Sequence, residues 1–200
     1  MGTRNLTMVI ADGETKVAQY GQWDGYPEGQ GLTALRFLQS NDLESFKKKL
    51  SNVRFLNQQD EKEKGEFLKS IGAPDGWLNE QQNRAFNLKY PYLSRDHGAD
   101  VLKMIMDADN EVLLEDMSEF VTDSLFCEWA CVIDFGKSTF EVYEGFNKEP
   151  LAEGERFKEM PVEEGSEYYP VKLRKSYQLD GLPTEGDFLN DFRENKKEEK

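Results

Sequence analysis

The sequence has almost none of the residues on which histidine-based and thiol-based catalysis depend. Its 200 residues include one histidine, His97, and two cysteines, Cys127 and Cys131. A metal site built on several histidines is therefore excluded, and any couple of a nucleophile with histidine would have to use His97. The 39 acidic residues show no spacing that singles out a magnesium site. We accordingly assign no catalytic residue, no metal and no cofactor to the chain.

Basic residues are also scarce. Lysine and arginine together number 25 against 39 acidic residues, which gives a formal net charge of −14. Because phosphate contacts require lysine and arginine, this balance argues against a broad nucleic-acid-binding surface. A local basic pocket stays open, and so do two explanations of the acidity, namely solubility and mimicry of nucleic acid.

Long apolar runs are absent as well. No stretch approaches the roughly 18 apolar residues of a membrane span, and the amino terminus lacks the apolar segment of a signal peptide. Cys127 and Cys131 would lie about 13 Å apart on one strand, at ~3.3 Å per residue, which is too far for a disulfide. We therefore expect buried thiols in a reducing compartment, a cytoplasmic location and no membrane partner.

Two segments alternate apolar and polar residues as antiparallel hairpins do. Residues 5–10 and 16–23 flank the turn pair Asp12-Gly13. Residues 128–146 repeat the pattern around a second turn that contains glycine. These two hairpins are the clearest strand signals in the chain.

Helical patterns lie between and after the hairpins. Leu32, Leu35 and Leu38 are spaced to share one helix face. Asn41 with Glu44 resembles a capping box for a second helix. The remaining expectations are a surface loop or exposed helical turn at 57–66, helices at 79–88 and 99–106, the latter capped by Ser94 or Asp96, a strand at 168–179 and a short helix from Thr184.

These elements predict one α+β domain. Its antiparallel sheet is built from an N-terminal and a C-terminal β-hairpin, and the intervening helices pack on that sheet. The domain covers residues 1–192, and residues 193–200 form a disordered charged tail.

Residues 19–31, QYGQWDGYPEGQG, are unlike an ordinary strand or helix. Four glycines allow unusual backbone conformations, and three aromatic residues offer flat apolar faces with polar edges. Gln22 and Asp24 can read the edge of a heterocycle or an amide. A short hairpin would bring Arg4 near the Trp23 end of the stretch. Stacking rings with a guanidinium are what a nucleotide-like ligand requires.

A purely structural interpretation of the same residues stays open. Trp23 and Tyr26 could be core residues that close the hairpin, with the glycines only shaping a tight loop. Arg95 and Asp96 could form an exposed salt bridge and a helix cap. The residues alone do not decide between the two interpretations.

The chain resembles an uncharacterised family found in bacteria, phages and, more distantly, fungi. The residues that carry the resemblance are GTR-x-L at the start, QYGQWDGYPEGQG at 19–31, LSRDHGADVL at 93–102 and the hairpin sequence at 127–146. The resemblance implies a site but no activity. Carried over by motif, that site comprises Thr3, Arg4, Tyr20, Gln22, Trp23, Asp24, Tyr26, Pro27, Glu28, Arg95 and Asp96.

A second likeness covers only about the first twenty-five residues. The opening MGTR, followed by a strand, a turn and YGQWD, looks like amino-terminal-nucleophile hydrolases of the bile-salt hydrolase type. Gly2 stands where those enzymes carry their nucleophilic cysteine, and glycine has no side chain with which to attack. Thr3 could replace it only if Met1 and Gly2 were both removed.

The leading hypothesis is a non-enzymatic accessory protein that binds a small polar ligand of the nucleotide type. In a phage it would sequester a nucleotide immune signal inside the bacterial host cell, by analogy with known sponge proteins. The alternatives are a hydrolase that uses Asp24, Asp96 or processed Thr3, and an acidic protein that binds a host protein or mimics DNA. The predicted ligand-binding residues are Arg4, Tyr20, Gln22, Trp23, Asp24, Tyr26, Arg95 and Asp96.

Overall fold

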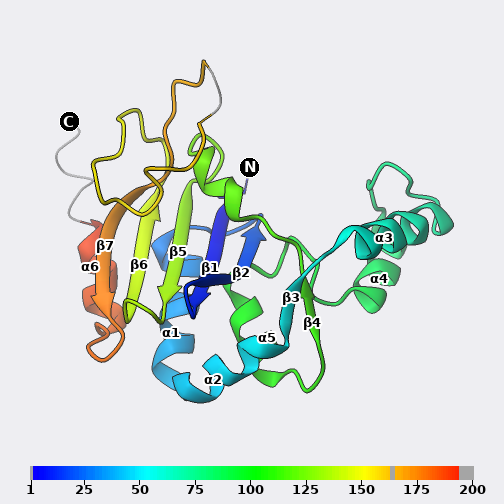
Figure 1. Cartoon of the computed structure of the whole chain (residues 1–200), viewed down its shortest axis with the longest axis horizontal. Coiled ribbons are helices and arrows are strands. Elements are labelled where there is room, and N and C mark those ends of the chain that lie inside the picture. Colours follow the sequence, from blue (N-terminus) through cyan, green and yellow to red (C-terminus); the bar gives the residue numbers. More distant parts are fainter. Residues whose placement is uncertain (1, 163–164, 194–200) are drawn as a thin grey trace.

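A five-stranded sheet forms the centre of the protein (Figure 1). The computed structural model describes residues 2–162 and 165–193. The strand order across the sheet is β2-β1-β5-β6-β7. The strands are β1 (Asn5–Ala11), β2 (Glu14–Gly21), β5 (Trp129–Asp134), β6 (Thr139–Glu144) and β7 (Lys172–Gln178).

Six α-helices accompany the sheet in the described residues, so the predicted α+β class is confirmed. Short turns of π-helix at Pro27–Gly31 and of 3-10 helix at Leu50–Asn52, Gly98–Asp100 and Ser118–Thr122 join several of the elements. The helices are α1 (Leu32–Ser40), α2 (Leu43–Lys49), α3 (Gln58–Ser70), α4 (Glu80–Lys89), α5 (Val101–Asp107) and α6 (Glu185–Arg193).

The sheet is mixed, whereas the sequence analysis predicted an antiparallel sheet. The pairs β1–β2, β5–β6 and β6–β7 are antiparallel, but β1 and β5 run parallel, from Asn5 opposite Trp129 to Ile10 opposite Asp134. Alternating patterns predict the relative direction of two strands only when a short turn joins them. They do not predict it for strands more than a hundred residues apart. The long helical segment between β2 and β5 supplies the kind of crossover connection that parallel neighbours need.

Each face of the sheet has its own apolar core. On one face Val9, Val17 and Ile133 pack with residues of α1, α2, α5 and α6, including Phe46 and Phe188. The opposite face is covered by the 3-10 turn at Ser118–Thr122 and by the long segment between β6 and β7. The buried residues of that second core include Leu6, Met8, Val132, Tyr143, Leu151 and Phe157.

Helices α3 and α4 project from the body as an arm (Figure 1). In the sequence they lie between two short strands, β3 (Val53–Phe55) and β4 (Val112–Leu114), which pair in parallel. Neither of these fully described helices has a buried residue. Both begin at capping boxes, with Asn57 and Asn79 as the capping residues. The segment 57–66, expected as a surface loop or an exposed helical turn, is the capping residue and the first part of a regular helix.

The predicted helix caps differ from those observed. Asp42, not Asn41, caps α2, and its carboxylate accepts a hydrogen bond from the amide of Glu44 at 3.1 Å. Neither Ser94 nor Asp96 caps the helix that follows them, because the chain first makes a 3-10 turn at Gly98–Asp100. Thr184 does precede α6, and its hydroxyl accepts a hydrogen bond from the amide of Asp187 at 3.2 Å.

Two further predictions concern the ends of elements. Both cysteines are buried and free, as expected, but Cys127 precedes β5 and the two thiols belong to opposite cores. Arg193, predicted as the first residue of the tail, is the last residue of α6. Residues 194–200 of that predicted tail lie outside the described residues. Within the described chain, no helix is long and apolar enough to cross a membrane.

Candidate functional site

The stretch 19–31 leaves the end of β2 and enters α1 through a tightly packed turn. Asp24 has a positive φ of 55°, and its carbonyl oxygen accepts a hydrogen bond from the amide of Gln30 at 2.8 Å. A Cβ atom on Gly29 would lie 2.1 Å from that oxygen, and one on Gly25 would lie 2.8 Å from the carbonyl oxygen of Thr3. These two glycines are therefore required for close backbone approach.

The second unusual stretch, around Arg95, lies directly against the first. The amide of Gln22 donates to the carbonyl oxygen of Arg95 at 2.9 Å, and Gln19 Nε2 donates to the carbonyl oxygen of Ser94 at 3.1 Å. The indole Nε1 of Trp23 donates to Asp96 Oδ1 at 3.0 Å. The fold thus joins two segments about 70 residues apart in the sequence, and we call the surface they form the Trp23–Arg95 surface.

Three of the predicted side chains form a hydrogen-bonded chain on this surface. Gln22 Oε1 accepts from the hydroxyl of Tyr20 at 2.8 Å and from Nη2 of Arg95. Burial raises the pKa of the Tyr20 phenol, and the charges of Arg95 and Arg4 lower it in part. Tyr20 is therefore a neutral donor near neutral pH. Arg95 forms no ion pair with any residue in the described ranges, and its guanidinium contacts the neutral oxygen of Gln22.

Trp23 and Tyr26 are not core residues. Their exposed fractions are 51% and 52%. Arg95 and Asp96 do not pair with each other; each contacts the stretch 19–31 instead. Of the purely structural interpretation, only the need for glycines in the turn agrees with the structure.

Tyr20 and Arg95 also border a small depression of about 80 Å³. The ring of Tyr20 packs edge-on against Phe120, with their centroids 5.1 Å apart. Glu115, on another wall of the depression, lies 3.5 Å from Lys64. The depression has room for a single compact group of a ligand rather than for a whole ligand.

Arg4 makes its contacts elsewhere. Its guanidinium lies 4.3 Å from the centroid of the Phe126 ring, and its Nε is 4.0 Å from Glu128 Oε1. The main-chain amide of Arg4 donates to the same carboxylate oxygen at 3.2 Å. The sequence analysis expected Arg4 beside Trp23, but the contacts of its side chain are with Phe126 and Glu128.

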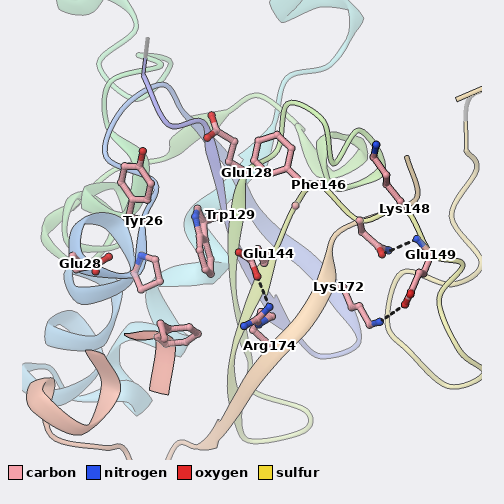
Figure 2. Close-up of a pocket in the computed structure, with 14 residues that line it drawn as sticks. Tyr26, Glu28, Glu128, Trp129, Glu144, Phe146, Lys148, Glu149, Lys172 and Arg174 are labelled. Atoms are coloured by element: carbon pink, nitrogen blue, oxygen red, sulfur yellow. Dashed lines mark hydrogen bonds and ion pairs between the residues drawn. The ribbon is translucent and has the colours of Figure 1, made fainter. Parts of the chain in front are cut away.

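A groove of about 990 Å³ lies on the other side of the turn, where β5 and β7 begin and β6 ends (Figure 2). Tyr26 and Pro27 belong to its lining, so the predicted residues are divided between two places. The groove residues that the sequence analysis missed include Glu128, Trp129, Glu144, Phe146, Lys148, Lys172, Arg174 and Phe192. Phe146, an aromatic residue that follows the hairpin strand β6 after one glycine, carried a signal that could have marked it.

The structure leaves little room for a nucleophile at the amino terminus. A Cβ atom on Gly2 would lie 2.3 Å from the carbonyl oxygen of Gln22 and 2.4 Å from the ring of Trp23. Thr3 is 5% exposed. A side chain at position 2, where the hydrolase likeness places the nucleophile, does not fit this arrangement.

The other residues with catalytic potential are engaged in structural contacts. Nε2 of His97 lies 2.8 Å from the carbonyl oxygen of Pro91, which makes that nitrogen the protonated one. Burial raises the pKa of the Cys131 thiol to about 12 and raises that of Cys127 further, so neither is a thiolate at neutral pH. Among the described residues, no group of three or more His, Cys, Asp or Glu side chains could hold a metal ion.

A buried ionic cluster ties the segment between β6 and β7 to the sheet. Arg156 donates to Asp134 Oδ2 at 2.7 Å and to both carboxylate oxygens of Glu141, at 2.8 and 2.9 Å. The hydroxyl of Tyr143 donates to Glu141 at 2.6 Å. Burial raises the pKa of both carboxyl groups, but their hydrogen bonds outweigh it and hold each pKa below its usual value. This closed cluster has a structural role.

Comparison with protein-family models, with curated proteins and with solved structures finds no match for the chain. The two resemblances seen in the sequence therefore stay predictions.

Proposed function

We propose that the protein binds a small, planar, anionic ligand of the nucleotide type at the Trp23–Arg95 surface. The observation that carries the proposal is the pairing of an exposed, anchored indole with a guanidinium that has no carboxylate partner among the described residues. The two come from segments that only the fold brings together.

Trp23 is suited to stack on a ligand ring. Half of its side chain is exposed, and the hydrogen bond to Asp96 fixes the edge of the indole. A ring held in place by its edge loses little conformational freedom when a base stacks on its face. Stacking of a base on an aromatic side chain contributes about 1–3 kcal/mol.

Arg95 is suited to meet the negative charge of the same ligand. Gln22 accepts a hydrogen bond from Arg95 through a neutral oxygen, which orients the guanidinium without cancelling its charge. The remaining N–H groups can donate to a phosphate or a carboxylate. Because the chain as a whole carries a net charge of −14, an anion will bind only where such a local positive group is available.

Isothermal titration calorimetry with a panel of nucleotides, including cyclic signalling nucleotides, tests this function. We expect one member to bind, with affinity reduced about tenfold or more in Trp23→Ala and in Arg95→Ala. The matched controls are Trp77→Ala and Arg84→Ala. Both residues lie in the arm region, where Trp77 is 84% exposed and Arg84 pairs with Glu80 at the surface.

Two outcomes would count against the proposal. One is the absence of binding by every nucleotide at millimolar concentration. The other is a ligand whose affinity is unchanged by Trp23→Ala and Arg95→Ala, which would place its site elsewhere on the molecule.

A further inference from the structure

The groove beside Tyr26 has aromatic walls that the proposed nucleotide site does not use. Tyr26, Trp129 and Phe146 all line it, and Tyr26 and Phe146 are 52% and 53% exposed. In Figure 2, Tyr26 and Glu28 lie on one side of the groove, with Trp129, Glu128 and Phe146 toward its middle. The indole of Trp129 packs edge-on against Phe192, another lining residue, with the ring centroids 5.9 Å apart.

Phe146 is held in the groove at an energetic cost. Its φ of 54° is in the left-handed region, which bulky side chains rarely adopt. The amide of Phe146 donates to the carbonyl oxygen of Ser124 at 2.7 Å, and the next amide donates to the hydroxyl of Ser124 at 3.1 Å. These bonds impose the strained backbone, yet the ring that they position gains little burial. Such strain is common where a side chain is placed for a ligand.

The charges on the two sides of the groove differ. Glu28 forms no ion pair and no side-chain hydrogen bond with any residue that the structure describes. Glu128 Oε1 lies 4.0 Å from Nε of Arg4 and accepts a hydrogen bond from the main-chain amide of Arg4 at 3.2 Å. In Figure 2, Glu28 lies near Tyr26, and Glu128 lies near Phe146. The basic residues are further along the groove. Lys172 pairs with Glu149 at 3.1 Å, Arg174 pairs with Glu144 at 2.6 Å, and Lys148 lies 5.2 Å from the ring centroid of Tyr168.

We propose that this groove binds a basic side chain, arginine or lysine, on an extended segment of a partner protein. The cation would lie among the rings of Tyr26, Trp129 and Phe146, with the carboxylates of Glu28 and Glu128 beside it. A cation over aromatic faces is attracted by the ring quadrupoles, and more strongly when it is partly desolvated. The strongly acidic chain also favours the approach of a basic partner.

Calorimetry with a blocked peptide, acetyl-Gly-Gly-Arg-Gly-Gly-amide, tests the proposal against the same peptide with citrulline, a neutral residue of similar shape. We expect the arginine peptide to bind about tenfold more tightly, since the citrulline peptide lacks the charge. The double variant W23F/W77F leaves Trp129 as the only tryptophan. Its fluorescence should change with the arginine peptide and locate the binding in the groove.

Two groove variants and their controls separate binding from folding. Phe146→Gly removes the ring and relieves the strained backbone. It should therefore raise the melting temperature and lower the affinity for the arginine peptide about fivefold. Glu28→Gln should lower the affinity for the arginine peptide without changing the melting temperature. Trp77→Ala and Asp75→Asn change exposed residues of the arm and should leave the peptide affinity as it is.

Several results would overturn the proposal. They are no binding of the arginine peptide at millimolar concentration, equal binding of both peptides, and an affinity unchanged by Phe146→Gly. Self-association of the protein that Phe146→Gly abolishes would assign the groove to a second copy instead. Arg95→Ala should leave peptide binding intact, so failure of this proposal and failure of the nucleotide proposal can be told apart.

Discussion

The indole nitrogen of Trp23 donates a hydrogen bond to the carboxylate of Asp96 at 3.0 Å, across 73 positions of the sequence. This contact holds together the two stretches whose composition is most unusual. It also fixes the orientation of the ring that we propose as the stacking surface of the ligand site.

Removing the acceptor tests the importance of this contact. Asp96→Ala should free the indole and lower ligand affinity by about tenfold, because the ring must then be ordered on binding. Since the pair lies at the surface, the free energy of unfolding should fall by no more than about 1 kcal/mol. Asp96→Asn keeps an acceptor oxygen and should retain most of the affinity. Tryptophan fluorescence anisotropy in the W77F/W129F background measures the mobility of Trp23, and equal mobility in wild type and Asp96→Ala would contradict the account.

The turn before α1 should be intolerant of side chains at its closest backbone approach. Gly29→Ala would place a Cβ atom 2.1 Å from the carbonyl oxygen of Asp24, so the turn must shift. We expect a loss of about 2 kcal/mol or more in urea unfolding, together with weaker ligand binding.

Gly65→Ala is the matched control for that variant. It lies inside α3, and a Cβ atom added there would have no other atom within 4 Å. It should stabilise the protein by about 0.5–1 kcal/mol, through helix propensity. Equal effects of the two substitutions would show that the backbone of the turn is not constrained as described.

The cluster around Arg156 should be among the most sensitive points of the fold. Arg156→Met leaves Asp134 and Glu141 buried without their cation, and removal of one partner from such a pair costs about 3–5 kcal/mol. The exposed pair Arg84–Glu80 is the control, and Arg84→Met should cost less than about 0.5 kcal/mol. Urea unfolding of both variants measures the difference. A cost near zero for Arg156→Met would contradict the role assigned to the cluster.

The same cluster predicts how stability depends on pH. Both carboxyl groups have a pKa below the usual value in the folded protein, so their contribution to stability is complete above the unfolded-state pKa of about 4 and is lost as the pH falls below it. In Arg156→Met the unpaired carboxylates favour protonation instead. The stability difference between wild type and variant should therefore shrink as the pH is lowered from 6 toward about 3. Urea unfolding across this range measures it, and a constant difference would refute the assignment.

Local features of the fold were predictable from the sequence. The leucine spacing gave α1, and the alternating segments gave the antiparallel pairs β1–β2 and β5–β6. The parallel pairing of β1 with β5 was not predictable, because the relative direction of strands joined by a long segment depends on how the helices between them pack. At 57–66 only a loop or a helical turn was predicted, because a polar helix that buries no residue has no apolar stripe.

The candidate site was predictable in part. The residue types at 19–31 and at 95–96 marked the two stretches, yet nothing in either shows that Trp23 meets Asp96. Arg4 was misplaced because the side chains of neighbouring residues in extended backbone point to opposite sides. The side chain of Asn5 points toward the stretch, where its Nδ2 donates to the carbonyl oxygens of Gly21 and Trp23, so that of Arg4 points away. The groove was missed because its lining comes from five separate parts of the chain, which meet only through the strand order.

The most direct test of the nucleotide-binding function is native mass spectrometry of the protein after incubation with the nucleotide panel. The account predicts one retained nucleotide per chain in the wild type and none in Arg95→Ala, with Arg84→Ala behaving like the wild type. A wild-type protein that retains no nucleotide at millimolar concentration, or an Arg95→Ala variant that retains it equally well, would contradict the account.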